Sequence, residues 1–204
     1  MKRRDKMTNH QIIAMVLLTL FYSAYLLKGL LQWKKGIRMN HLGKGEKSSY
    51  TIKIEKLLHL ATILVIPVEI ISILYDSVSW NQELLTRVGL ALVGLGLVIF
   101  CIAMWQMRDN WRAGIPTSDA TQLVVTGIYR WSRNPAFLGF DFTYLGILIA
   151  FYNPILAIIT LWVIIMMHLQ ILEEERFLRD VFKQEYQIYC QTTGRYLMPI
   201  RREK

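Results

Sequence analysis

The sequence has few of the residues that interrupt regular structure or cross-link a chain. Its 204 residues include only five prolines, twelve glycines and two cysteines. Charged residues make up 19%, against about 25% in an average soluble domain. These shortages exclude a disordered chain, a collagen-like fibre and a small secreted domain held by disulfides. They favour long, uninterrupted elements instead.

The cysteines and histidines do not indicate a disulfide or a metal site. Cys101 lies within an apolar run, so no disulfide with Cys190 is expected. The chain contains no C-x-x-C pair, and His168 has no second histidine at metal-ligating spacing. We therefore expect no metal cofactor, and we interpret His168 as a packing residue.

Apolar residues are abundant and the charges are unevenly placed. Hydrophobic residues make up 53% of the chain, and its mean hydropathy is +0.30. The net charge is +9, but the basic residues lie between long apolar stretches rather than among exposed aromatics. A membrane protein with Lys and Arg in its loops gives the same total charge. This distribution argues against nucleic acid as a partner.

Five apolar segments predict an all-α, polytopic membrane protein. A spanning helix needs roughly 20 mostly apolar residues. The candidate spans are residues 12–31, 57–75, 84–107, 137–151 and 155–171. The last two are short, and the turn signal Asn153-Pro154 between them predicts a helical hairpin. Gly89, Gly94 and Gly96 in the third span are expected to permit close helix packing.

The chain after the last span is expected to continue as an amphipathic helix. Its apolar residues follow helical spacing and are Leu178, Val181, Phe182, Tyr186 and Tyr189. Acidic and basic residues occupy much of the remaining surface. Such a helix is expected to lie on the membrane surface or over a cytoplasmic pocket.

The positions of Lys and Arg predict the orientation in the membrane. Loop 32–56 carries seven, loop 108–134 carries four and the tail 172–204 carries seven. With five spans these segments share one side, which has 18 basic residues against 5 on the other. The positive-inside rule makes that side cytoplasmic and places the N-terminus outside, although the N-terminal tail is itself basic.

Two segments of the second half carry a recognisable pattern. Residues 126–139 read TGIYRWSRNPAFLG, and residues 173–189 read EEERFLRDVFKQEYQIY. In this order and separation they resemble the integral-membrane isoprenylcysteine carboxyl methyltransferase and phospholipid methyltransferase family. The resemblance covers about residues 108–200 and implies S-adenosylmethionine as the cofactor. It divides the chain into a three-span region, 1–107, and a cofactor-binding region, 108–204, of one integral domain.

The resemblance also implies which residues contact the cofactor. Carried onto this sequence they are Thr121, Gln122, Leu123, Val124, Tyr129, Asn134, Pro135, Ala136, Phe137 and Glu174. Asn134 stands where the prenylcysteine enzymes have His, and Phe137 where they usually have Tyr. Asparagine still donates and accepts hydrogen bonds, whereas phenylalanine keeps only the ring.

Three further residues concern the acceptor of the methyl group. Gln170 stands where the prenylcysteine enzymes have an Arg that pairs with the substrate carboxylate, and Gln cannot replace its bidentate pairing. Asp141 lies seven residues after Asn134, so helical spacing predicts that both face one cavity. Glu69 is a second acid within a span. We interpret Gln170 and Asp141 as acceptor-side catalytic residues, and the departures favour an amine or lipid headgroup over a carboxylate.

The sequence leaves two other functions open. A non-catalytic family member acting as a membrane scaffold or lipid-binding module is compatible with the changes at positions 134 and 170. An NADPH-dependent membrane reductase is a less favoured alternative, because sterol reductases with a similar C-terminal region are about twice as long. The favoured hypothesis is a membrane-embedded methyltransferase whose partner, the methyl acceptor, is a membrane lipid or a lipophilic small molecule.

Overall fold

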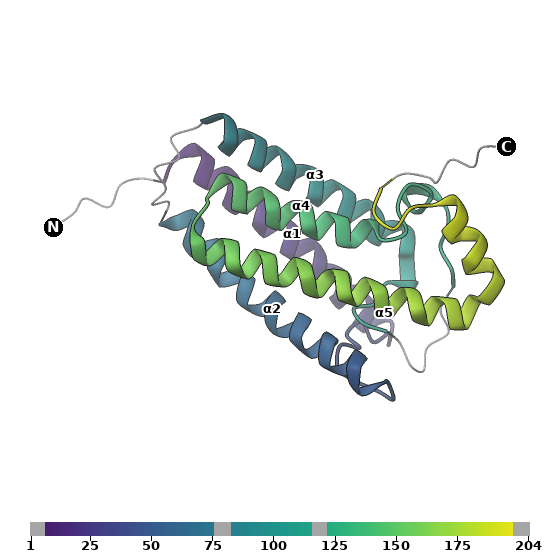
Figure 1. Ribbon diagram of the computed structural model, residues 1–204. Coiled ribbons are helices and arrows are strands. Elements are labelled where there is room, and N and C mark those ends of the chain that lie inside the picture. Colours follow the sequence, from purple (N-terminus) through teal and green to yellow (C-terminus); the bar gives the residue numbers. More distant parts are fainter. Residues whose placement is uncertain (1–6, 76–82, 116–121, 198–204) are drawn as a thin grey trace.

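The computed structural model describes residues 7–75, 83–115 and 122–197, and its regular structure is helical (Figure 1). The long helices are α1 (Asn9–Lys34), α2 (Ser49–Leu74), α3 (Glu83–Met107), α4 (Pro135–Ala150) and α5 (Pro154–Thr192). Two short 3₁₀ helices, η1 (Arg108–Asn110) and η2 (Gly127–Arg130), follow α3. Within the described ranges no β-strand forms, which confirms the all-α prediction.

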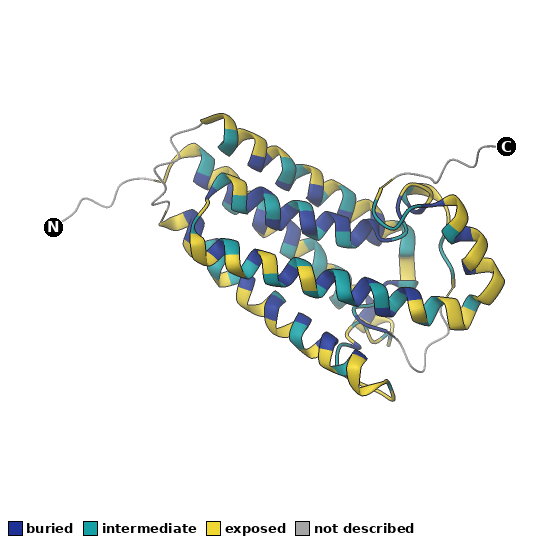
Figure 2. Ribbon diagram, in the orientation of Figure 1, coloured by how far each residue is buried: buried dark blue, intermediate teal, exposed yellow. Residues whose placement is uncertain are grey.

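Four of the helices are long and apolar enough to cross a membrane, and α4 is a shorter apolar helix of 16 residues. The sixteen residues of α4 begin at Pro135, whose fixed backbone angle suits the first helical position. Its hairpin partner α5 begins at Pro154, with the Asn153 side chain accepting a hydrogen bond from the Leu156 amide. The predicted hairpin is thus present. Much of α4 is buried against the neighbouring helices (Figure 2).

Helices α3 and α4 make the most extensive contact in the bundle, and glycines bring their backbones together. A Cβ atom on Gly89 would lie 2.5 Å from the carbonyl oxygen of Gly146. A Cβ atom on Gly96 would lie 2.6 Å from that of Gly139. The predicted packing role is therefore confirmed for Gly89 and Gly96. It is wrong for Gly94, which faces open space.

The loops that were predicted to share one side of the membrane meet at one end of the bundle, here called the loop end. The Gln32 side chain donates to the carbonyl of Trp111 at 2.9 Å. The His41 amide donates to the carbonyl of Ala113 at 2.8 Å. From the C-terminal segment, the carbonyl of Gly194 accepts from the Arg133 amide at 3.0 Å. Segments that are far apart in sequence thus form a single cap (Figure 1).

Helix α5 projects beyond the bundle at the loop end and then bends. Lys183 has φ 44° and ψ −115°, which breaks the helical backbone and turns the last segment back over η2 (Figure 1). Tyr186 and Tyr189 are buried by this return, but Val181, before the bend, is 47% exposed. The predicted apolar stripe is therefore interrupted, because helical spacing does not continue across a non-helical residue.

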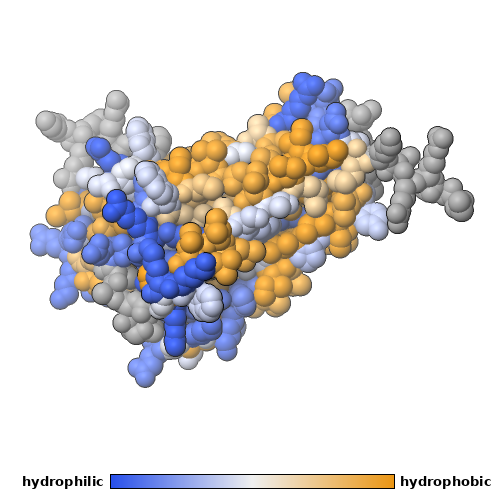
Figure 3. Space-filling model, turned by 180° about the vertical axis from the view of Figure 1, so that it is seen from behind, coloured by the Kyte–Doolittle hydropathy of each residue, from blue (hydrophilic) through white to orange (hydrophobic). Residues whose placement is uncertain are grey.

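Side chains on the flank of the bundle form a broad hydrophobic band between two more hydrophilic ends (Figure 3). Large apolar residues are also exposed on several helices, among them Leu26 and Leu27 of α1, Val98 of α3, and Ile158 and Leu161 of α5. A band of this kind matches the hydrocarbon core of a bilayer.

Candidate active site

A cavity of about 710 Å³ opens at the loop end and continues between α1 and α2. We call the part at the loop end the chamber; its lining includes Tyr129, Asn134, Gln170 and Glu174. We call the continuation between α1 and α2 the arm; its lining includes Thr19, Tyr22, Ile63 and Ile66. Nine of the ten cofactor residues implied by the resemblance line this cavity: Gln122, Leu123, Val124, Tyr129, Asn134, Pro135, Ala136, Phe137 and Glu174. The tenth, Thr121, lies outside the described residues. Residues from the loop before α4, from α4 and from α5 thus meet in one space.

A tight turn places Tyr129 in the chamber wall. Gly127 has φ +61°, a conformation that favours glycine, and any Cβ there would collide with the Gln106 side chain. The Gln106 side chain instead accepts a hydrogen bond from the Ile128 amide at 2.8 Å. The Tyr189 hydroxyl donates to the carbonyl of Tyr129 at 2.5 Å, so the returned end of α5 fixes the same turn. Burial raises the pKa of the Tyr129 hydroxyl, which keeps it protonated.

Gln170 and Glu174 form a polar pair one helical turn apart on α5. The Gln170 amide nitrogen donates to Glu174 Oε1 at 3.0 Å. Burial raises the pKa of the Glu174 carboxyl to about 7, although the hydrogen bond from Gln170 opposes the shift. Gln170 is 1% exposed, and its Oε1 has no hydrogen-bond partner among the described residues. Both side chains line the cavity, so the chamber offers a carboxyl group and an uncommitted carbonyl oxygen.

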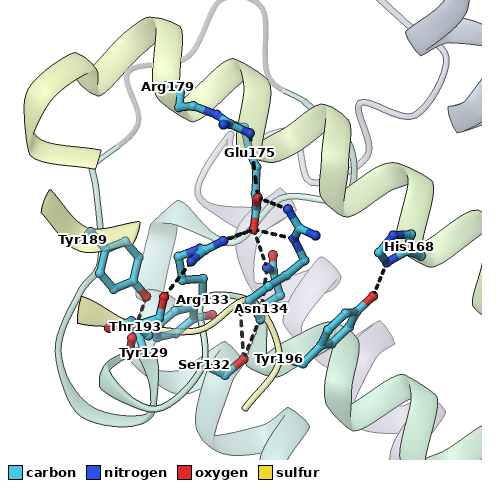
Figure 4. A network of polar contacts seen from close by, with 11 residues as sticks. Tyr129, Ser132, Arg133, Asn134, His168, Glu175, Arg179, Tyr189, Thr193 and Tyr196 are labelled. Carbon is cyan, nitrogen blue, oxygen red and sulfur yellow. Dashed lines mark hydrogen bonds and ion pairs between the residues drawn. The ribbon is translucent and has the colours of Figure 1, made fainter. Parts of the chain in front are cut away.

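The next glutamate, Glu175, has a different environment (Figure 4). Arg133 donates to its Oε1 at 2.8 Å, and Arg195 donates to its Oε2 at 2.9 Å. The Asn134 side chain also donates to Oε1, at 3.4 Å. Burial opposes ionisation of Glu175, but the hydrogen bonds from Arg195 and Arg133 outweigh it and hold the pKa below its ordinary value. This cluster, the Glu175 clasp, joins α5, the start of α4 and the C-terminal segment.

The sequence patterns did not predict the clasp. Arg133 forms an ion pair with Glu175. Its Nη1 also donates to the carbonyl of Thr193 at 2.6 Å. The available signal was the acidic triplet itself, since three consecutive acids on a helix cannot all point to solvent when one face is packed.

A second buried carboxylate, Glu55, organises the opposite wall of the chamber. Lys47 lies 2.7 Å from its Oε2, and the side chains of both residues are at most 4% exposed. Its oxygens also accept from the amides of Gly43 and Ile115. Glu55 therefore joins α2 to both loops that cover the chamber. Nearby, the Thr51 hydroxyl donates to Glu173 at 2.6 Å and fixes α2 to α5.

The two acids within the membrane spans are buried but do not line the cavity. The prediction that Asp141 faces the same cavity as Asn134 is therefore wrong. Asn134 precedes α4 with φ −129° and ψ 51°, so helical spacing cannot be counted from it. The residues of α4 that line the cavity are instead Pro135, Ala136, Phe137, Phe140 and Tyr144. Glu69 lies behind the wall of the arm, where it accepts a hydrogen bond from Tyr22.

His168 contacts the C-terminal segment rather than the cavity. Its Nδ1 lies 2.6 Å from the Tyr196 hydroxyl, and the two rings stack with centroids 5.9 Å apart (Figure 4). This arrangement agrees with the packing role expected for His168.

Comparison with known proteins agrees with the site. The family model described as phospholipid methyltransferase matches residues 85–185, about half of the chain. The protein-S-isoprenylcysteine O-methyltransferase of Saccharomyces cerevisiae is 32% identical over 123 residues, which are 58% of this chain and 51% of that protein. The protein of the same name from Rattus norvegicus is 30% identical over 110 residues, 52% of this chain and 38% of that protein. No solved structure matches the chain significantly.

The fold and the site define a polytopic helical membrane protein with a lined chamber at one end. The chain belongs to the phospholipid methyltransferase family. It spans about half the length, or less, of the curated relatives it matches.

Proposed function

We propose that the protein transfers a methyl group from S-adenosylmethionine to a lipophilic acceptor that enters from the bilayer. The observation that carries the proposal is the convergence of nine residues, from three separate segments, on one cavity. The family supplies the reaction class, and the cavity supplies a place for both reactants. The chain's own activity is a proposal because the relatives are matched over only part of their length.

The chamber residues suit the chemistry of this cofactor. S-adenosylmethionine carries an ammonium group, ribose hydroxyls, a carboxylate and a sulfonium cation. Glu174 is a carboxyl group that can pair with the ammonium or accept from the ribose. Aromatic rings attract a sulfonium by cation–π interaction, and Tyr129, Phe137, Tyr186 and Tyr189 all line the cavity.

The chain's contribution to the reaction is positioning. The cofactor, when bound, supplies an activated methyl group for an in-line displacement, in which an acceptor lone pair forms the new bond as the carbon–sulfur bond breaks. The Gly127 turn and the Glu175 clasp hold Tyr129 and Asn134 on one side of the chamber. Gln170 and Glu174 form the other side of the chamber. A fixed separation and alignment of the two reactants is sufficient for a large acceleration.

The arm suits a lipophilic acceptor. It runs along α1 and α2, which pack against each other much less than α3 packs against α4. Thr19 and Ile63 line it and are also exposed on the flank of the bundle, so the arm opens sideways between these two helices. An amphiphile can therefore enter from the bilayer and present its headgroup to the chamber.

We propose an amine or another uncharged headgroup rather than a carboxylate. The free Gln170 oxygen is a hydrogen-bond acceptor, and its nitrogen is committed to Glu174. Among the cavity-lining guanidinium groups, Arg133 is paired with Glu175 and Arg112 donates to backbone carbonyls at the mouth. A neutral amine methylated here takes over the positive charge of the sulfonium, so charge is conserved without a catalytic base.

The loop end is proposed to face the cytoplasm, where S-adenosylmethionine is made. The three segments that meet there carry most of the Lys and Arg residues in the chain. In a bacterium this is the inner membrane, and in a eukaryote the endoplasmic reticulum. Labelling of single cysteines introduced at positions 45 and 120 of intact cells tests it, and external labelling at 120 contradicts the proposed side.

Equilibrium binding to detergent-solubilised protein tests the function. We expect S-adenosylmethionine to bind and NADPH not to bind. Tyr129→Ala and Glu174→Ala should weaken binding, the latter about tenfold or more, since a charge-assisted hydrogen bond contributes about 1.5–3 kcal/mol. Asp180→Asn, on the exposed face of the same helix, is the matched control. Unchanged affinity in both cavity variants rejects this chamber as the cofactor site, and NADPH binding supports the reductase alternative.

A further inference from the structure

The arm is more polar than a slot for a plain hydrocarbon tail needs to be. Thr19, Tyr22 and Ser23 lie at positions i, i+3 and i+4 of α1 and line one wall. The opposite wall, on α2, is mainly apolar, with Ile63, Ile66 and Ile70, although His59 and Thr62 also line it. Within a bilayer, polar side chains are costly unless they find partners. Lipid cannot satisfy the hydrogen-bonding groups of the α1 wall, and few side chains of the opposite wall can.

A buried acid stands behind this wall. The Tyr22 hydroxyl donates to Glu69 Oε2 at 2.8 Å, and Glu69 is fully buried. Glu69 Oε1 has no hydrogen-bond partner among the described residues. Two residues earlier, Pro67 lacks an N–H group, so the carbonyl of Ile63 in the arm loses its helical partner. The pair Tyr22–Glu69 thus lies in an incompletely satisfied polar region within the span.

This polar region lies deep in the membrane part of the cavity. On α2 the lining residues extend from Leu58 to Ile70. At 1.5 Å per residue this is a length of roughly 18 Å. His59 lines the arm nearer the chamber. Glu69 lies ten residues further along α2, which is a rise of about 15 Å along the helix. A group held by Tyr22 is therefore well separated from the headgroup in the chamber.

We propose that Tyr22 and Glu69 form a hydrogen-bonding subsite for the tail of the acceptor. The inference rests on the proposed function and names the acceptor more closely: an amphiphile with a second polar group, a hydroxyl, in the part of its tail that lies deep in the arm. Tyr22 contacts the tail. A tyrosine hydroxyl donates and accepts at once, so it accepts from the tail hydroxyl while donating to Glu69. Glu69 is a positioning residue that fixes the direction of the Tyr22 hydroxyl.

A matched set of probes tests the subsite. The four probes are S-farnesylcysteine and S-farnesylcysteamine, each with and without a hydroxyl on the terminal isoprene unit. Their dissociation constants are measured on the solubilised full chain in saturating S-adenosylmethionine, whose own affinity is determined first. We expect the hydroxylated probe to bind about three- to tenfold tighter, the effect of one buried hydrogen bond. The preference is expected with either headgroup, because the subsite is remote from it.

Variants separate recognition from a merely structural hydrogen bond. Tyr22→Phe should reduce the preference to less than twofold, and Glu69→Leu should weaken it. Glu69→Gln still accepts from Tyr22 and should restore it. Tyr25→Phe, which removes the same atom from a cavity-lining tyrosine one turn away, should leave it unchanged.

Two results overturn the subsite. One is equal affinity for both tails with both headgroups, including the absence of binding by all four probes. The other is a preference that survives in Tyr22→Phe. Either result with normal S-adenosylmethionine affinity leaves the proposed function standing, whereas loss of that affinity in the wild-type protein removes the proposed function first.

Discussion

Two pairs of helices in this bundle are built in opposite ways. Between α3 and α4, glycines on both sides allow backbone-to-backbone contact and leave no space. Between α1 and α2, tyrosine, threonine and isoleucine side chains surround the arm of the cavity. The closely packed pair carries the start of the family region. It also holds the turn that bears Tyr129 and the start of α4, which Asn134 precedes. We propose that the open pair provides access for the acceptor. The two pairs would then combine a rigid cofactor chamber with a passage to lipid.

Substitutions in the packed pair should have the largest effect. A methyl group on Gly96 meets backbone and Thr143 atoms within 3.0 Å, and these cannot move aside cheaply. We expect Gly96→Ala to destabilise the fold by about 1–3 kcal/mol, the usual cost of overpacking. Gly94→Ala is the matched control, because it faces open space and alanine favours the helix. Thermal unfolding in detergent measures both. Equal melting temperatures would show that the close approach is not required.

The Glu175 clasp should be nearly as important. Removing one partner of a buried ion pair leaves an uncompensated charge, and Arg133 is only 9% exposed. We expect Glu175→Ala to cost about 3 kcal/mol and to release the C-terminal segment, seen as faster proteolysis after residue 192. Arg179→Ala serves as the control, since Arg179 is 53% exposed and 3.9 Å from Glu175. A fully stable, protease-resistant Glu175→Ala protein contradicts the clasp.

The two adjacent glutamates also show how far the sequence predicted the site. The family motif placed Glu174 in the cofactor site, and the structure places it in the chamber wall. Nothing local distinguished it from Glu175, because the partners of Glu175 lie 42 and 20 residues away along the chain. Long-range pairing of this kind is set by tertiary packing, which single-sequence patterns do not encode.

The helices themselves were well predicted, because apolar runs of sufficient length have few alternatives. The errors arose where regular periodicity stops. Asp141 was assigned to the cavity by counting turns from Asn134, which is not helical. Val181 was assigned to a continuous stripe that ends at Lys183. Gly89 and Gly96 were correctly predicted to pack closely. Their partners, Gly139 and Gly146, were not identified, because the spacing of one helix does not reveal the face of another.

Glu174 should make cofactor binding depend on pH. Burial raises its pKa from 4.5 to about 7, so the folded chain retains a proton that the unfolded chain releases. This contribution to stability is complete below pH 4.5 and is lost as the pH rises through about 7. Affinity for S-adenosylmethionine should change in the opposite direction, rising through the same range as the carboxylate forms. Titration calorimetry between pH 5.5 and 8.5 measures it. Glu174→Gln should bind weakly at every pH, and a wild-type affinity that falls with pH contradicts the assignment.

The smallest effect concerns the headgroup and sharpens the comparison between chamber and arm. Gln170→Arg replaces an uncommitted carbonyl oxygen by a guanidinium one turn from Glu174, the arrangement expected for a carboxylate acceptor. Glu174 will partly neutralise the new guanidinium, so the increase in activity on a carboxylate acceptor should be modest. We expect methyl transfer from labelled cofactor to N-acetyl-S-farnesylcysteine, which has a carboxylate and no free amine, to rise about two- to fivefold, within the range of one partly compensated charged hydrogen bond. Transfer to S-farnesylcysteamine should fall, because a cationic side chain repels an ammonium and lowers its occupancy.

Gln170→Met, which fills similar volume without polar atoms, separates the effect of charge from the effect of shape. If the unmodified protein already methylates the carboxylate better than the amine, the free oxygen of Gln170 does not select the acceptor, and selection belongs to residues elsewhere in the chamber.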